Sequence, residues 1–99
     1  MNSGETSQNI SLREHIADLL NIPIELAMNA ATLIVYGNRS LIAEQHKGIR
    51  EYTEQRIAFR TGQGLVIVEG KELCLKRLNG TELVIEGELF SIGLGEEKS

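Results

Sequence analysis

The stretch that most constrains the fold of this chain runs over residues 57–94. It reads as three strands joined by tight turns, and the triplet Leu65-Val66-Ile67 recurs 83 − 65 = 18 residues later as Leu83-Val84-Ile85. Each copy leads into a glycine, Gly70 or Gly87, that is followed by a second apolar run. Short apolar runs separated by turns predict antiparallel strands with one buried face.

The last of these strands has an apolar face that changes sides. Leu83 and Leu89 share one face of an alternating strand, whereas Phe90 and Ile92 fall on the other face. Strict alternation cannot bury both sets against one core layer. We therefore predict a bulge or a bend near Gly87, as found where strands cross between sheets or close a barrel.

Further strand and turn signals complete a β-rich pattern. Residues 32–36 are β-branched and aromatic, residues 37–38 form a turn, and residues 40–46 can pair back as a hairpin. Asn79-Gly80 favours a type I′ turn, in which both central residues have positive φ. The predicted fold class is mainly β: a small antiparallel meander forming a sandwich or a partly open barrel, with one short N-terminal helix.

The N-terminal helix is predicted over residues 11–21. Ser11 and Glu14 have the spacing of a capping box, and Pro23 ends the helix. The apolar residues fall at helical spacing and form one stripe: Leu12, Ile16, Leu19 and Leu20. A helix this short is marginal in isolation, so the stripe needs a surface. It either covers the sheet or docks on a partner or a membrane surface. The helix stripe and an edge strand of the sheet, whose backbone groups are unpaired, are the two candidate interfaces.

Length and composition indicate one small domain. The chain has 99 residues, of which 41% are hydrophobic, and a domain of this size buries roughly 60–65% of its unfolded surface. We predict flexible tails at residues 1–10 and 95–99 and a single domain at 11–94, with the helix at 11–21 and the β-core at 32–94. No signal peptide or membrane span is recognisable, and a single cysteine fits a reducing compartment, so a cytoplasmic location is expected.

Charge and motif spacing argue against several kinds of site. A net charge of −4 with scattered Lys and Arg residues is unlike a nucleic-acid-binding surface. Glu44 and His46 share a predicted, exposed strand face, but a structural zinc site takes four ligands, and His15 and Cys74 lie on other elements. Cys74 stands between two leucines, and we expect it to act as a small apolar residue. The glycines lack phosphate-loop spacing. No catalytic residue, cofactor or metal is predicted.

A family resemblance rests on several segments. They are residues 44–53 (EQHKGIREYT), 57–61 (IAFRT), 64–67 (GLVI) and 82–89 (ELVIEGEL), with Gly70, the Leu73/Leu75 strand and an N-terminal part at residues 21–38. On these segments the chain resembles the YabP/YqfC family of sporulation proteins, and most closely its YqfC-like branch. Gln45 stands where the family usually has Asn, and a second Pro near Ala30 is missing.

The resemblance implies a role in endospore formation, in the mother cell of a spore-forming Gram-positive bacterium. The resemblance implies no enzymatic activity. The expected function is a non-catalytic interaction or assembly module at the developing spore envelope, whose partner is a membrane-anchored sporulation protein or a second copy of this chain. The alternative is a small regulatory β-domain that binds a small-molecule ligand in an apolar pocket. An enzyme is the third hypothesis, for which the sequence names no residue set.

Overall fold

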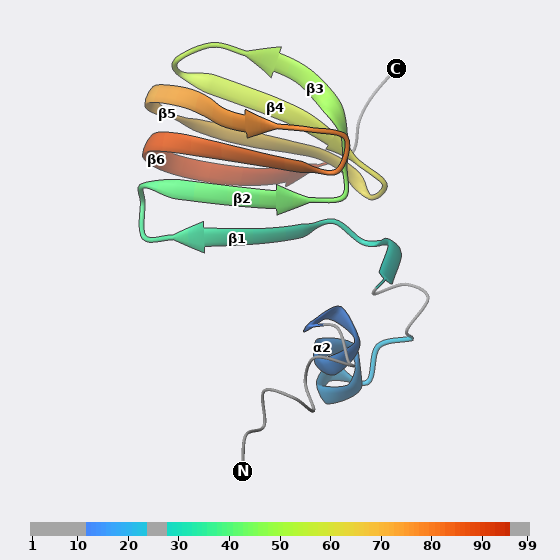
Figure 1. The fold of residues 1–99 in the computed structure, drawn as a ribbon. Helices are drawn as coiled ribbons and strands as arrows, with labels where there is room; N and C mark the ends of the chain where they lie inside the picture. The colour runs from blue at the N-terminus through green and yellow to red at the C-terminus, as the bar shows by residue number, and fades with distance from the viewer. Residues whose placement is uncertain (1–11, 24–27, 96–99) are drawn as a thin grey trace. The chain divides into compact units, whose positions relative to one another are not determined.

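The computed structural model describes residues 12–23 and 28–95. The chain divides into two compact units, residues 1–30 and residues 31–99. The first unit holds helix α2 (Leu12–Leu20), and the second holds the six strands (Figure 1). The predicted helix is thus confirmed to within one residue at each end, while Ser11 of the capping box lies outside the described residues.

Helix α2 ends in a Schellman motif. Asn21 adopts a left-handed conformation with φ of 59°, which asparagine tolerates better than most residues. The N–H of Ile22 then donates to the carbonyl of Ala17 at 2.9 Å, and the N–H of Asn21 donates to the carbonyl of Asp18 at 3.4 Å. With Pro23 directly after it, this cap stops the helix where the sequence predicts.

The strands form one antiparallel sheet in the order β1-β2-β6-β5-β4-β3, which confirms a mainly β fold. Their bounds are β1 (Thr32–Tyr36), β2 (Ser40–Glu44), β3 (His46–Tyr52), β4 (Arg56–Thr61), β5 (Gly64–Leu78) and β6 (Glu82–Gly95). Strands β3 to β6 follow one another as a meander. The β1–β2 hairpin joins this meander beside β6, so β2 and β3 are neighbours in the chain and not in the sheet.

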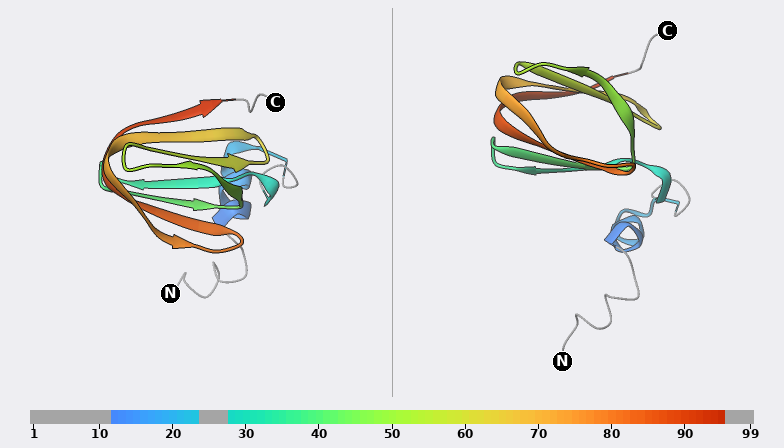
Figure 2. Two further views of the ribbon diagram at one scale, coloured as in Figure 1. Left: turned by 90° about the horizontal axis from the view of Figure 1, so that it is seen from above. Right: turned by 45° about the horizontal axis from the view of Figure 1, so that its top comes forward.

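The two long strands fold the sheet over on itself. Strands β5 and β6 have 15 and 14 residues, and both turn near their middle, so that their halves lie in two layers (Figure 2). The first half of β6 pairs with β2, whereas the first half of β5 pairs with β4. The apolar core comes from β2, β4, β5 and β6: Leu41, Ala43, Ile57, Phe59, Val66, Val68, Leu73, Leu83, Ile85 and Leu89.

The predicted irregularity at Gly87 is confirmed. Lys71 pairs with Glu88 and Cys74 pairs with Glu86, so two residues of β5 oppose Gly87 alone. Gly87 has φ of 146°, and Glu72, within the bulge, has φ of 55°. A Cβ on Gly87 would lie 2.7 Å from the carbonyl oxygen of Glu72. Glycine is therefore required here both by conformation and by the close approach of β5.

A second bulge, at Phe90, explains the change of apolar face. Gly70 pairs with Leu89 and Glu69 pairs with Ser91, so Phe90 is the extra residue on β6. One extra residue shifts the alternation by one position, and Ile92 accordingly packs against the same core as Leu89. Phe90 itself remains 64% exposed.

Two turns hold the bend from either side. The N–H of Leu89 donates to the carbonyl of Asn38 at 2.7 Å, which ties β6 to the β1–β2 turn. The N–H of Leu73 donates to the carbonyl of Glu54 at 2.8 Å, which ties β5 to the β3–β4 turn. Backbone groups that leave the strand ladder at the bend thus find partners in these turns, as buried polar groups require.

The turn between β5 and β6 is placed correctly by the sequence, but its predicted type is wrong. Neither Asn79 nor Gly80 has positive φ, so the turn is not of type I′. Instead the Asn79 side chain closes it, because its Oδ1 accepts from the N–H of Thr81 at 3.0 Å and from the N–H of Glu82 at 2.8 Å. Asparagine acts here through its side chain and not through its tolerance of positive φ.

The corner between β2 and β3 is held by a buried histidine. Gln45 has φ of 70°, which turns the chain sharply. His46 is only 7% exposed, with Nε2 at 2.7 Å from the carbonyl oxygen of Asn79 and the N–H of Gly48 donating to Nδ1 at 3.0 Å. Nδ1 therefore accepts and Nε2 donates, which is the neutral form with both ring nitrogens satisfied. The prediction that His46 lies on an exposed strand face is wrong, because the Gln45 corner redirects it inward.

Candidate interaction surface

Strand β1 forms one edge of the sheet, and β3 forms the other (Figure 1). An edge strand has unpaired backbone N–H and C=O groups, which proteins usually protect with charges, bulges or bends. Strand β3 carries such protection, since it contains Lys47, Arg50 and Glu51 and its pairing with β4 shifts register twice. Strand β1 has the sequence TLIVY, without a charged residue, and pairs with β2 in one unbroken register.

A cleft of about 250 Å³ lies beside β1, between this strand and the second half of β6. Val35 lines it from β1, and Phe90 and Ile92 line it from β6. Val35 pairs with the buried Leu41 and shares its face, yet it is 44% exposed because no strand lies beyond β1. The inner apolar face of the sheet therefore reaches solvent at this edge.

Two other exposed apolar residues lie at the same place. Tyr36 is exposed at the end of β1, next to Val35, and Phe90, which lines the cleft from β6, is exposed as well. Single exposed apolar residues are ordinary, but several beside an open edge are typical of an interaction site. We name the outer edge of β1 together with Val35 and Tyr36 the β1 edge.

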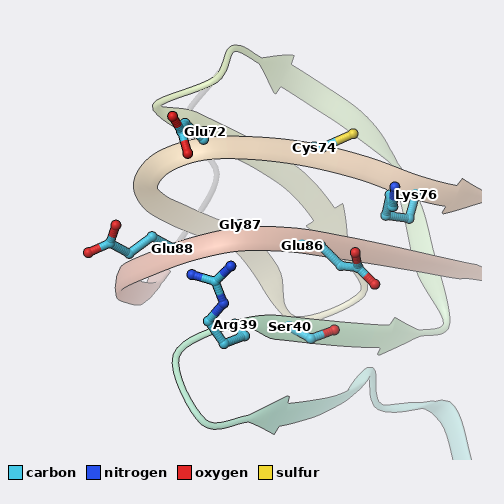
Figure 3. Close-up of a pocket in the computed structure, with 8 residues that line it drawn as sticks. All are labelled: Arg39, Ser40, Glu72, Cys74, Lys76, Glu86, Gly87 and Glu88. Atoms are coloured by element: carbon cyan, nitrogen blue, oxygen red, sulfur yellow. The ribbon is translucent and has the colours of Figure 1, made fainter.

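A second cleft, of about 460 Å³, is polar and lies over the Gly87 bulge (Figure 3). Arg39 reaches it from the β1–β2 turn and Lys76 from β5, and three carboxylates share it: Glu72, Glu86 and Glu88. It is open to solvent and its charges are of both signs. Such a surface differs from the concave, mainly apolar pockets that hold small molecules.

Cys74 lines this polar cleft and is exposed (Figure 3). The prediction that it serves as a small apolar core residue is therefore wrong, because the bulge at Glu72 and Leu73 shifts the alternation of β5 and turns Cys74 outward. We expect Cys74→Ser to change the free energy of unfolding by less than about 0.5 kcal/mol, as exposed substitutions do. Urea denaturation would check this, and a loss above about 1 kcal/mol would contradict the exposed placement.

The residues of the sheet that were weighed as metal ligands do not form a cluster. Glu44 is exposed on β2, and both ring nitrogens of His46 are occupied by backbone groups. Within residues 12–23 and 28–95, no group of three or more His, Cys, Asp or Glu side chains could hold a metal ion.

One charged cluster joins three strands on the exposed surface. Arg56 of β4 donates from Nε to Glu51 at 2.8 Å and from Nη1 to Glu69 at 2.9 Å. The hydrogen bond with Glu51, and to a smaller extent the one with Glu69, raises the pKa of the Arg56 guanidinium. These pairs are exposed, so they orient side chains and add little stability.

The candidate helix stripe is only partly described. Leu12 and Ile16 lie on α2, and their side chains are outside the described part of the chain. Leu19 and Leu20 are exposed. No helix among the described residues has the length and apolar character needed to cross a membrane.

The sequence analysis predicted an edge strand as a candidate interface but did not identify residues 32–36 as that edge, and it did not predict that Phe90 is exposed beside it. The signal for the edge was present, since residues 32–36 contain no charge. The sequence did not give the position of this strand in the sheet. That position was needed, because an uncharged strand can lie in the buried centre of a sheet as well as at its edge.

The fold and this surface define a class: a small antiparallel β-domain whose sheet folds into two layers and leaves an uncharged edge open. Comparison with known proteins gives the family. The model of the YabP family matches residues 28–99, so the chain belongs to the YabP family. It is also similar to the uncharacterized protein YqfC of Bacillus subtilis (strain 168), with 26% identity over 70 residues, which cover 71% of this chain and 75% of that protein.

Proposed function

We propose that this protein acts in endospore formation as a non-catalytic assembly module at the developing spore envelope. Membership in the YabP family and similarity to a Bacillus subtilis protein support the biological setting. The single observation that supports assembly is the β1 edge, which is uncharged, unbroken in register and bordered by exposed apolar residues. An edge strand with these three properties can bind a further strand through its backbone N–H and C=O groups.

Binding of a small-molecule ligand is the less favoured alternative. It calls for a concave apolar pocket with a few convergent polar groups. The space between the two layers is filled by a core that includes Phe59, Ile57 and Leu41, each 0% exposed. The polar cleft over Gly87 is open, so the described surface favours an assembly role over a ligand site.

The proposed role is tested by gene deletion in a spore-forming bacterium that carries this protein. We expect vegetative growth to be unchanged and the yield of heat-resistant spores to fall, with recovery when the wild-type gene is returned. A fluorescent fusion should concentrate at the envelope of the developing spore during sporulation. A normal spore yield, or a uniformly distributed fusion, would contradict the proposal.

The helix stripe is a second candidate contact within the same role, and Ile16→Asp separates its two interpretations. If the stripe covers the sheet, the substitution should lower the melting temperature strongly, because a charge replaces a buried side chain. If the stripe binds a partner, the melting temperature should stay nearly unchanged and recovery of the partner from sporulating cells should be lost. Normal melting together with normal recovery would eliminate the helix as an interface.

A matched control for this experiment lies on the same helix. His15 precedes Ile16 and is exposed, so His15→Asp adds the same carboxylate without touching the stripe. We expect it to leave both the melting temperature and the partner recovery at wild-type values. An effect equal to that of Ile16→Asp would indicate a general effect of charge on α2.

A further inference from the structure

The β1 edge can be matched to a particular kind of partner strand. A strand that pairs with it must place its side chains beside Leu33 and Val35 on the inner face and beside Ile34 on the outer face. A charged residue at such positions would lose water without gaining an opposite charge, because β1 offers none. The fitting partner is therefore an uncharged strand.

Within residues 31–95, β1 itself is the strand that meets this requirement. Each of the other five contains at least one charged residue. Strand β1 is also short and regular, so two copies can pair antiparallel about a two-fold axis. Opposite residues in such a pair point to the same face of the sheet. The inner-face residues of β1 have odd numbers, so an odd-numbered residue of one copy must lie opposite an odd-numbered residue of the other.

The register with the longest overlap places the two-fold axis at Ile34. Leu33 of one copy then lies opposite Val35 of the other, and the two Ile34 residues face each other. Thr32 lies opposite Tyr36 in the same way. All of these pairs are uncharged, and apolar and β-branched pairs are favourable across antiparallel strands. Leu33 of the second copy would also cover Val35, which is exposed at the open edge of the sheet.

We infer that the chain forms a homodimer in which the β1 strands of two copies pair antiparallel about Ile34, joining two six-stranded sheets into one. This inference rests on the proposed assembly function and names the contact that carries it. The second copy supplies backbone hydrogen bonds to the open edge and an apolar cover for the cleft beside Val35. The charged and bulged edge of β3 takes no part, because its features oppose pairing.

The register is tested by a cysteine at the axis. In the Cys74→Ser background, Ile34→Cys places two thiols on directly opposite residues, whose Cα atoms are about 4.5–5.5 Å apart in an antiparallel pair and within reach of a disulfide. Under mild oxidation we expect a covalent dimer in most of the chain. Leu78→Cys in the same background is the control, because Leu78 is exposed at the far end of β5, and it should stay largely monomeric.

Charge provides an independent test in the full-length chain. Val35→Lys adds a charge to the open end of the inner face, which is the way natural sheets block edge pairing. Sedimentation should show a concentration-dependent dimer for the wild type and at least about a ten-fold weaker dimer for Val35→Lys. Leu78→Lys, the matched control, should dimerise as the wild type does. The circular dichroism spectrum and melting curve of each variant at low concentration check that it is folded.

The outcomes separate this inference from the proposed function. The β1 dimer is overturned if the wild-type chain is monomeric at all concentrations. It is also overturned if the Ile34→Cys and Leu78→Cys variants form the covalent dimer to the same extent. If the gene deletion still lowers the spore yield in that case, the proposed function stands without it. If the β1 dimer forms as described but deletion of the gene leaves sporulation normal, the inference is supported and the proposed function is overturned.

Discussion

Gly87→Val is expected to lower the free energy of unfolding by about 2–6 kcal/mol. Two causes of about 1–3 kcal/mol each add up here: a β-branched residue at positive φ, and overlap with atoms that cannot move freely. The φ of Gly87 is 146°. Its Cβ would approach two backbone atoms of the β5 bulge, the carbonyl oxygen of Glu72 at 2.7 Å and the Cα of Leu73 at 2.9 Å.

Gly95→Val is the matched control. Gly95 also lies in β6, has no positive φ in the left-handed range and has open space around its Cβ position. We expect it to change stability by less than about 0.5 kcal/mol. Urea denaturation of both variants measures the difference. Equal stability of the two would show that the bulge does not depend on glycine.

Phe59→Ala should cost about 3–5 kcal/mol, the range for a large aromatic side chain truncated in a core. Phe59 is 0% exposed and lies in the core between the two layers of the sheet. The chain contains two phenylalanines, and the other, Phe90, is 64% exposed. The same truncation at Phe90 therefore serves as the control and should cost less than about 1 kcal/mol.

Thermal and urea unfolding of the two variants would compare these sites directly. The experiment is best done at low protein concentration, where the proposed dimer does not contribute to stability. A similar loss at both positions would contradict the assignment of Phe59 to the core and of Phe90 to the surface.

Local patterns in the sequence predicted most of the individual strands. The hairpin of residues 32–44, strand β4 and the turn at Asn79 are all where alternation and turn residues place them. An irregularity in this part of β6 was predictable as well, because two apolar sets on opposite faces cannot share one core layer. The extra residue that changes the face is Phe90, three residues after the glycine at which the sequence predicted it. These features depend on residues that are close in sequence.

Features that depend on distant pairing were not predictable in the same way. Nothing local in residues 40–44 indicates that β2 pairs with β6, and without that order the open edge of β1 could not be recognised. Cys74 and His46 were placed wrongly for a related reason. A residue with positive φ lies shortly before each of them, Glu72 two residues before Cys74 and Gln45 directly before His46. Gln45 turns His46 inward, and the bulge at Glu72 leaves Cys74 exposed on the face opposite the buried Leu73. Glutamate and glutamine seldom adopt positive φ, so the sequence does not predict it at these two positions.

The pairing of β2 with β6 has a consequence for how the chain is made. Leu41 pairs with Ile85, which is 85 − 41 = 44 residues later in the sequence. A growing chain emerges from the ribosome N-terminus first at roughly 5–20 residues per second, so the β1–β2 hairpin is synthesised well before the strand that anchors it. Contacts between distant segments also slow folding, because a long loop must close before they form. The sheet is thus completed only after its last strand has been translated, and until then the hairpin has two open edges instead of one.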